Sequence, residues 1–343
     1  MSRNIQEHET ITLGEAKSVI TSLAGKESVL LLSPPGLGKS AVVAQAAAEA
    51  GLELRSLLGT QIAPEDVSGI PRIVGERSVF CPPRVLLPEE PKPFCLFLDE
   101  LPACAPDIQK AFYSLLLERR LGEHALPEGT WVVAAGNRVS DRALVRAMSS
   151  ALVNRVFILN LRLDVKEWLQ WGANSGIRKD ILSFISFSPS SLMREVPAES
   201  LPFSTPRAWS SLSAALDLAE ESGILNKAIL RSLVFGRVSA QDAALFCTLF
   251  EEDQWQLETP ADYIAGIAKM PESSDARWLV LSKIREAIQA KAVICGPADV
   301  NTFLSNLPLE QRSALLIGLL KEWGGMGANA SILNTFIEYA GIQ

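Results

Sequence analysis

The chain is 343 residues long, with 48% hydrophobic and 21% charged residues and a net charge of −7 at pH 7. This composition is that of a globular protein rather than a disordered one, and at about 150 residues per domain the length predicts two or three domains. The acidic balance argues against a broad nucleic-acid-binding face, which needs clustered lysine and arginine, although a local basic groove stays open.

Neither a membrane span nor a metal site made of cysteine and histidine is predicted. Residues 1–9 are polar and lack the apolar core of a signal peptide, and no stretch approaches the ~18 consecutive apolar residues of a membrane span. We therefore expect a cytoplasmic protein. The five cysteines show no C-x-x-C pairing and the two histidines have no ligand-like neighbours, so buried or incidental thiols are expected.

The first predicted elements surround a glycine-containing loop. Residues 11–23 have apolar side chains at helical spacing and predict a helix. The apolar run Val29–Leu32 predicts a strand, and the alanine-rich run Ala41–Ala50 predicts a second helix. Between them lies the segment Ser33–Ser40, which reads S-P-P-G-L-G-K-S. Strand, loop and helix in this order are the context in which a phosphate-binding loop, or P-loop, occurs.

The residues of this loop suit the binding of a nucleoside triphosphate. Small residues allow successive backbone N–H groups to turn inward around phosphates, and the N-terminus of the following helix adds a dipole that favours anions. Lys39 would neutralise the β- and γ-phosphates, and Ser40 would place its hydroxyl on Mg²⁺. Ser33 replaces the first glycine of the usual pattern, but Pro34 and the two glycines can still shape the turn. The predicted ATP-binding residues are Pro35, Gly36, Leu37, Gly38, Lys39 and Ser40.

A polar segment and a hairpin are predicted next. Residues 52–55 are a plausible second strand, and residues 61–71 are rich in turn formers and acids. Residues 73–80 form two short β-prone arms around Gly75-Glu76, which predicts a hairpin. We interpret this stretch as an insertion in the core.

A second motif decides between a P-loop and an ordinary glycine-rich turn. Residues 94–98 are apolar and end in Asp99-Glu100, which predicts a buried strand of a parallel sheet with two carboxylates at its C-terminal edge. An acidic strand end alone is usually solvated surface. Beside a P-loop, Asp99 is the expected Mg²⁺ ligand and Glu100 the expected group that positions or activates the attacking water.

Two further elements complete the first half. Residues 106–121 carry the apolar stripe of one amphipathic helix, and residues 131–135 predict another buried strand, which ends at Gly136-Asn137. The fold class predicted from this order is α/β, with a parallel-sheet P-loop core. The second half predicts helices with no chemistry-bearing motif.

The order of these motifs resembles the AAA+ ATPases, and within them the MoxR-like family. The resemblance covers about residues 10–220, and its most telling pieces are Phe97–Leu101, Ala134–Arg138 and Thr205–Arg207. It implies a core at 1–162 with a hairpin insertion at about 60–85, a helical lid at 163–262 and a C-terminal helical extension at 263–343.

The resemblance also implies roles for three polar residues. Asn137 corresponds to the sensor 1 residue, a polar side chain that orients the attacking water. Arg155 corresponds to the arginine finger that one subunit inserts into the site of its neighbour, with Arg142 and Arg146 as alternatives. Arg207 corresponds to sensor 2, at the start of a helix of the lid.

The function implied is ATP hydrolysis with Mg²⁺ in a ring, expected to be a hexamer, that remodels, assembles or activates a protein partner. The family suggests a partner with a von Willebrand factor A domain. Two alternatives stay open. One is a nucleotide-gated scaffold with slow turnover, and the other, disfavoured by the acidic balance, is a nucleic-acid remodeller. Glu100 and Arg155 favour the motor, because a gate needs only binding.

Overall fold

The structure is a computed structural model, and it describes residues 9–84, 86–87, 92–121, 124–138, 148–251, 258–271, 274–317 and 319–333. The chain divides into two compact units. Unit 1 comprises residues 1–168, 196–200 and 205–207, and unit 2 comprises residues 169–195, 201–204 and 208–343. The three-part division predicted above stays a prediction. None of the helices in the described ranges combines the length and the apolar character needed to cross a membrane.

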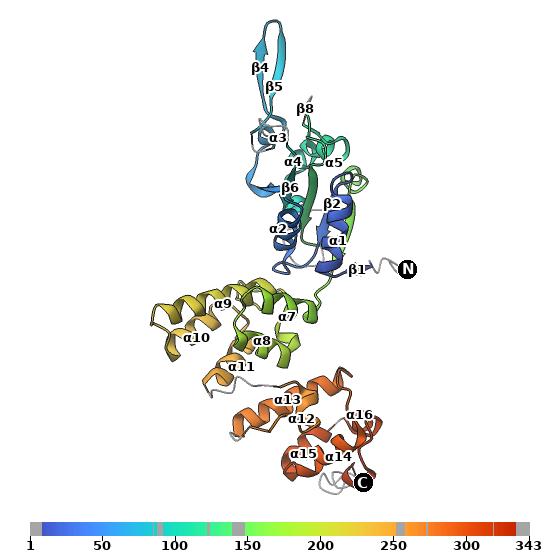
Figure 1. The fold of residues 1–343 in the computed structure, drawn as a ribbon, viewed down its shortest axis with the longest axis vertical. Coiled ribbons are helices and arrows are strands. Elements are labelled where there is room, and N and C mark those ends of the chain that lie inside the picture. Colours follow the sequence, from blue (N-terminus) through green and yellow to red (C-terminus); the bar gives the residue numbers. More distant parts are fainter. Residues whose placement is uncertain are drawn as a thin grey trace. The chain divides into compact units, whose positions relative to one another are not determined.

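Unit 1 is built on a six-stranded sheet in the order β1-β10-β2-β9-β6-β3, in which all pairs are parallel (Figure 1). The strands are β1 (Thr10–Ile11), β2 (Val29–Leu32), β3 (Glu53–Leu58), β6 (Phe94–Asp99), β9 (Trp131–Gly136) and β10 (Phe157–Leu161). The central strands are buried along most of their length because apolar residues face both sides. The predicted parallel-sheet P-loop core is confirmed.

The helices of unit 1 follow local sequence signals. Thr12 caps α1 (Leu13–Leu23) in a capping box with Glu15, so the predicted helix starts two residues later than its apolar pattern. Helix α2 (Lys39–Glu49) packs beside α1. The remaining short helices are α3 (Pro64–Ser68), α4 (Pro106–Ala111), α5 (Tyr113–Glu118) and α6 (Ser150–Val153).

The single helix predicted over residues 106–121 is wrong in two respects. It is interrupted at Phe112, which separates α4 from α5, and it ends at Glu118. Arg119 adopts the left-handed conformation at φ 54°, and its guanidinium donates hydrogen bonds to the carbonyls of Ala24, Lys26 and Thr130. These bonds hold Arg119 outside helical geometry, and the chain then enters the small hairpin of β7 (Arg120–Leu121) and β8 (His124–Ala125).

The predicted hairpin around Gly75-Glu76 is confirmed. Strands β4 (Ile70–Val74) and β5 (Arg77–Cys81) pair in antiparallel fashion and project beyond the rest of unit 1 (Figure 1). Every residue of β4 is exposed, including Ile70 and Ile73 at 69% and 80%. At the base of this ribbon, His124 forms a hydrogen bond with the carbonyl of Phe80. The ribbon therefore adds almost nothing to the core of unit 1.

Unit 2 is helical in its described part. Helices α7 (Val165–Asn174) and α9 (Pro206–Glu221) begin in residues assigned to unit 1 and continue into unit 2. The others are α8 (Lys179–Phe187), α10 (Lys227–Phe235), α11 (Ala240–Glu251), α12 (Pro260–Ile264), α13 (Ser274–Gln289), α14 (Pro297–Asn306), α15 (Leu309–Leu316) and α16 (Leu320–Gly325). Three rings pack in the core of this unit, with the centroids of Phe184, Trp209 and Phe246 5.2 to 5.7 Å apart.

Candidate functional site

The carboxyl ends of three neighbouring strands bring the sequence motifs together at one edge of the sheet. Leu32 at the end of β2 pairs with Gly136 at the end of β9, and Leu98 of β6 pairs with Ala134. The P-loop, the Asp99-Glu100 pair and Asn137 therefore emerge side by side. Ligands bind at this edge in open parallel sheets.

The P-loop requires glycine at two positions. Gly36 and Gly38 have φ values of 81° and 120°, in the region that side chains disfavour. A Cβ on Gly36 would also lie 2.7 Å from the hydroxyl of Thr205, so the loop backbone and Thr205 can approach closely only because this side chain is absent. Leu37 is buried, while Pro35 and Gly38 are half-buried.

Ser33 fits the position at which P-loops usually have a glycine. Among the non-glycine residues described, only Glu100, Arg119 and Lys291 have positive φ, so Ser33 occupies ordinary backbone space and needs no glycine. Its side chain is completely buried, and its hydroxyl lies 3.0 Å from the ammonium of Lys39. The serine therefore preserves the turn and adds an oxygen to the environment of Lys39.

Lys39 is held at the centre of the site. Its ammonium lies 3.0 Å from the carbonyl oxygen of Ser33, 3.3 Å from that of Pro34 and 3.0 Å from the Oδ1 atom of Asn137. The side chain is only 8% exposed. A buried cation at the start of a helix is suited to receive an anion, because its charge and the helix dipole act in the same direction.

The two carboxylates after β6 occupy different surroundings. Asp99 accepts a hydrogen bond from the hydroxyl of Ser40 at 3.0 Å and another from the backbone N–H of Glu100 at 3.0 Å. Glu100 adopts the left-handed conformation at φ 57°, which costs a non-glycine residue on the order of 1–3 kcal/mol. This left-handed residue directly follows the end of β6 at Asp99.

Thr60 is a site residue that the sequence reasoning missed. Its hydroxyl donates a hydrogen bond of 3.0 Å to the Oε2 atom of Glu100. It lies in the short 3-10 turn Gly59–Gln61 that follows β3, whose last residue, Leu58, pairs with Asp99. A polar residue directly after the strand neighbouring β6 was the available signal, but the second strand was predicted to end at residue 55.

Close packing fixes the backbone around Glu100. A Cβ on Gly59 would lie 2.2 Å from the sulfur of Cys104, and one on Gly136 would lie 2.3 Å from Pro102. Burial raises the pKa of the Cys104 thiol to about 11, with a smaller contribution from Glu100, so this thiol is uncharged near neutral pH. Cys104 is therefore a packing group and not a nucleophile.

Arg207 reaches the P-loop through its backbone. Its N–H donates a hydrogen bond of 3.0 Å to the carbonyl of Gly36, and its side chain is exposed. Thr205, packed against Gly36, is 5% exposed. Thr205 belongs to the Thr205–Arg207 motif, but it was not predicted as a site residue.

Arg155 is not brought into this cluster by any described contact. Its guanidinium donates to the carbonyl of Ala151 at 2.6 Å and lies 5.0 Å from the ring centre of Tyr113. Its Nε atom is buried and has no hydrogen-bond partner in the described part of the chain. The alternatives Arg142 and Arg146 lie outside the described residues.

The donor set fits Mg²⁺ and a polyphosphate. Ser40 and Asp99 place a hydroxyl and a carboxylate oxygen 3.0 Å apart, and magnesium prefers oxygen ligands of this kind together with water and phosphate. Lys39 and the first turn of α2 supply positive charge beside them. In the described residues there is no cluster of three or more histidine, cysteine, aspartate or glutamate side chains that could hold a metal alone.

The residues at this edge of the sheet lie within a segment that matches a known protein family. Residues 28–159 match the family model described as the AAA domain of the dynein-related subfamily. The matched region extends from β2 into β10 and includes the P-loop, the Asp99-Glu100 pair and Asn137. The parallel-sheet core of unit 1 therefore has the P-loop fold of AAA+ ATPases.

Several solved structures are distantly similar to the chain. A RuvB mutant from Thermotoga maritima is 17% identical, with 97% of this chain and 90% of that chain covered and a TM-score of 0.42. A putative ATPase from Cytophaga hutchinsonii is 14% identical over 79% and 88% of the two chains, with a TM-score of 0.37. NtrX from Brucella abortus in complex with ADP is 15% identical over 96% and 65%, with a TM-score of 0.39. No curated protein matches the chain.

Proposed function

We propose that the protein is a Mg²⁺-dependent ATPase of the MoxR-like kind, which acts in the cytoplasm as a ring and uses ATP hydrolysis to remodel, assemble or activate a protein partner. The observation that supports this most is the meeting of Lys39, Ser40, Asp99, Glu100 and Asn137 at one sheet edge. These five residues supply a phosphate cation, a metal site, a carboxylate for the attacking water and an amide that can orient that water.

Each residue has a distinct part in the proposed reaction. Lys39 holds the β- and γ-phosphates, and Ser40 and Asp99 hold Mg²⁺, which would neutralise the charge of the phosphates. Glu100 orients the attacking water and accepts its proton. Asn137, already hydrogen-bonded to Lys39, is placed to fix the same water through its amide. Arg207 of the same subunit would approach the γ-phosphate.

The ring follows from the position assigned to Arg155. This guanidinium makes no described contact with its own site, yet a cation is needed to stabilise the charge that develops on the transferred phosphoryl group. If a neighbouring subunit supplies it, a lone subunit has an incomplete site, and head-to-tail contacts of that kind close into rings. A hexamer is the size that the MoxR-like resemblance suggests.

The test is steady-state ATP hydrolysis across a range of protein concentrations, for wild type, Glu100→Gln and Arg155→Ala. We expect the specific activity to rise with concentration. Arg155→Ala should lower turnover by roughly 10³ to 10⁵, the effect of an arginine finger, while both variants still bind ATP. Arg162→Ala is the matched control, because Arg162 is an exposed arginine near the same strand, paired with Asp164. Activity independent of concentration, with Arg155→Ala as active as Arg162→Ala, would refute the trans-acting ring.

A nucleotide-gated scaffold with slow turnover is the second candidate. The hydrogen bond from Thr60 to Glu100 favours it, because it occupies one oxygen of the carboxylate that would activate water. ATP binding without measurable hydrolysis at any concentration would support the scaffold. DNA-stimulated hydrolysis that weakens with salt would instead support a nucleic-acid remodeller.

The β4–β5 ribbon is the proposed contact with the partner, together with the segment 61–71. Its exposed apolar side chains, among them Ile70, Ile73 and Phe80, support this assignment. The test is a deletion of residues 74–79, measured with a von Willebrand factor A domain protein of the same genome. We expect loss of partner binding and of partner-stimulated hydrolysis, with basal hydrolysis retained. Unchanged binding and stimulation would count against the assignment.

A further inference from the structure

The guanidinium of Arg155 is held by two groups of its own subunit. It lies 5.0 Å from the ring centre of Tyr113, which is the distance of a cation–π interaction. It also donates a hydrogen bond of 2.6 Å to the carbonyl of Ala151. The ring attracts the charge of the whole group, whereas the hydrogen bond uses one N–H group of the several that a guanidinium carries. These two contacts therefore orient the cation and leave further N–H groups for a phosphate.

Tyr113 is itself fixed at both ends of its side chain. It is the first residue of α5, and it packs against the buried core of unit 1. Its hydroxyl forms a hydrogen bond of 2.5 Å with the hydroxyl of Ser149. Ser149 is the N-cap of α6, because its hydroxyl also accepts from the N–H of Leu152 at 3.2 Å. Tyr113 therefore joins the start of α5 to the start of α6.

Arg155 follows the same short helix. Helix α6 ends at Val153, and the N–H of Arg155 donates to the carbonyl of Leu152 at 3.0 Å. Ala151, which accepts from the guanidinium, is also a residue of α6. The backbone and the side chain of Arg155 are thus both tied to the helix whose cap Tyr113 contacts. All of these residues belong to unit 1.

Such support matters for an arginine that meets a phosphate late in a reaction. Arginine has a long side chain, and fixing it at the moment of contact costs conformational entropy. A guanidinium that is already held by a ring and a carbonyl loses less freedom at that moment. Charged groups placed in advance are also the ones that stabilise a transition state most. Arg155 is half-buried, which agrees with a supported side chain rather than a solvated one.

We infer that Tyr113 is a positioning residue for Arg155: its ring sets the place of the guanidinium, and its hydroxyl, through Ser149, sets the place of α6. This inference rests on the proposed function, since it assumes that Arg155 acts in the site of a neighbouring subunit. Tyr113 does not contact the nucleotide in the proposed reaction. Its loss should therefore lower the rate of hydrolysis and leave ATP binding unchanged.

A second pair of an arginine and an aromatic ring provides a matched control. In α10, the guanidinium of Arg231 lies 5.3 Å from the ring centre of Phe235. Phe235 is half-buried like Tyr113, but it belongs to unit 2 and has no part in the proposed reaction. Loss of its ring should remove a similar contact without changing hydrolysis.

The first experiment measures kcat and KM for ATP and the thermal midpoint, for wild type, Tyr113→Leu, Tyr113→Phe and Phe235→Leu. We expect Tyr113→Leu to lower kcat about tenfold, which corresponds to ~1.4 kcal/mol, and to leave KM within about twofold. Tyr113→Phe keeps the ring, so its kcat should stay within about threefold of wild type. Phe235→Leu should have the wild-type kcat. Equal kcat values for Tyr113→Leu and Phe235→Leu would overturn the inference.

Mixed rings separate an effect on Arg155 from damage to the site of the same subunit. Glu100→Gln subunits lack the carboxylate for the attacking water but keep Tyr113 and Arg155. When co-expressed with Tyr113→Leu subunits, they supply a supported arginine to sites that keep Glu100. We therefore expect the mixture to hydrolyse ATP several times faster than the mean of the two separate preparations. A rate equal to that mean would contradict an action of Tyr113 through Arg155.

A mixture of Arg155→Ala with Glu100→Gln subunits keeps this test apart from the proposed function. It should also hydrolyse ATP faster than the mean of its components. Restoration with Arg155→Ala but not with Tyr113→Leu would refute the inference alone. No restoration with Arg155→Ala would refute the trans-acting arginine itself, and with it the ring of the proposed function. If the thermal midpoint shows that Tyr113→Leu does not fold, Tyr113→Met, a longer side chain without a ring, replaces it in every comparison.

Discussion

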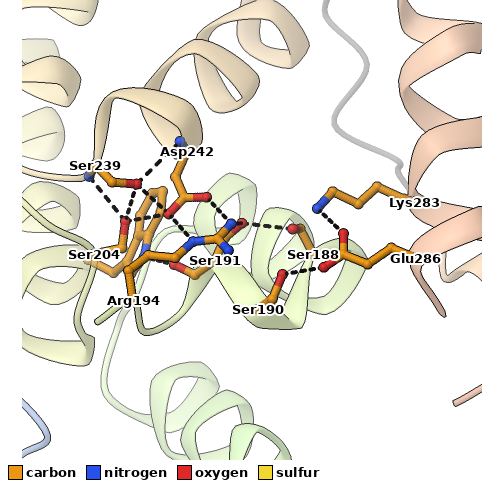
Figure 2. Close-up of polar contacts among 10 residues, drawn as sticks. Ser188, Ser190, Ser191, Arg194, Ser204, Ser239, Asp242, Lys283 and Glu286 are labelled. Carbon is orange, nitrogen blue, oxygen red and sulfur yellow. Dashed lines mark hydrogen bonds and ion pairs between the residues drawn. The ribbon is translucent and has the colours of Figure 1, made fainter. Parts of the chain in front are cut away.

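Asp99 at the sheet edge of unit 1 and Asp242 in unit 2 are both aspartates beside a hydroxyl group, but their hydrogen bonding differs. Asp99 is half-buried and accepts two hydrogen bonds, from Ser40 and from the N–H of Glu100. Asp242 is fully buried and accepts at least four, two of them from Arg194 (Figure 2). Asp99 therefore has lone pairs left for a metal and water, and Asp242 does not.

In the proposed function, this difference separates a reactive carboxylate, Asp99, from an anchoring one, Asp242. An unsaturated carboxylate at a strand end can exchange its ligands as a reaction proceeds, and little of the fold depends on it. A saturated carboxylate holds its neighbours in one arrangement, and its removal leaves a partly buried guanidinium without its partner. The two residues are of the same type, so only their donors distinguish the roles.

The largest effect should come from Asp99→Asn. We expect Mg²⁺-dependent ATP hydrolysis to fall by at least about 100-fold, because in the proposed reaction the negative charge of Asp99 holds the metal at the phosphates. The thermal midpoint without nucleotide should stay within about 2 °C of wild type, since this carboxylate makes few contacts. A large loss of thermal stability in Asp99→Asn would erase the proposed distinction from Asp242.

The next effect is on stability, for Asp242→Ala. Removing one member of a buried ion pair costs about 3 kcal/mol, and Arg194 would remain 28% exposed with its main acceptor gone. Urea unfolding followed by circular dichroism measures this cost. Ser190→Ala is the matched control. Ser190 lies next to Ser191, which hydrogen-bonds to Arg194, but its own side chain is exposed and hydrogen-bonds to Glu286 instead. Equal midpoints for the two variants would contradict the anchoring role.

A smaller effect is expected for Thr60→Val. The variant loses the hydrogen bond to Glu100, and we expect basal ATP hydrolysis to rise by up to about tenfold, because hydrogen bonds to charged groups contribute about 1.5 kcal/mol. Thr60→Ser keeps the hydroxyl and should hydrolyse ATP at the wild-type rate. A decrease in Thr60→Val that Thr60→Ser does not share would show that Thr60 orients Glu100 productively.

The smallest effect is a pH dependence of stability, with opposite signs for the buried aspartates Asp242 and Asp180. Burial would raise the pKa of Asp242, but its donors outweigh burial and the pKa lies below its usual range, so the charged form stabilises the fold. That stability is present above about pH 4 and is lost as the pH falls through the folded pKa. Burial raises the pKa of Asp180, against the opposing effect of Arg178, so its charged form costs stability above that pKa.

Thermal midpoints of wild type, Asp242→Asn and Asp180→Asn between pH 3 and pH 6 test these signs. As the pH falls, wild type should lose its advantage over Asp242→Asn and gain relative to Asp180→Asn. The basic partners of the two aspartates keep a constant charge over this range, because the pKa values of Arg194 and Arg178 are raised and both stay protonated. Glu286, which interacts with Arg194, has a pKa below its usual range, so it titrates only towards the acid end. If the thermal midpoints of Asp242→Asn and Asp180→Asn changed with pH in the same direction relative to wild type, the opposite pKa directions given for the two aspartates would be contradicted.

Much of unit 1 could be predicted because its signals are contiguous. The P-loop, the apolar strand before Asp99 and the strand before Asn137 are each read within ten residues, and a parallel sheet places their ends together. Ser33 could be kept in the motif because glycine is needed there only for geometry. Thr60 was missed because β3 runs three residues beyond its predicted end.

The hydrogen-bonded cluster around Asp242 could not be predicted, for a different reason. Ser191, Arg194, Ser204 and Asp242 are common residue types, and Arg194 and Asp242 are 48 positions apart. No period or spacing links them before the helices of unit 2 pack. The same limit applies to Arg119, whose three carbonyl contacts end α5 early, since two of those partners lie more than 90 residues away.

Hydrogen exchange of the β4–β5 ribbon can show whether another molecule covers it. Its strands hydrogen-bond to one another, all but one of its ten strand residues are exposed, and a lone two-stranded hairpin is only marginally stable in water. Its amide protons should therefore exchange with deuterium much faster than those of β2, β6 and β9. Any molecule that covers the ribbon would slow exchange there while the sheet stays unchanged, so these amides report binding without a label or an assay of activity.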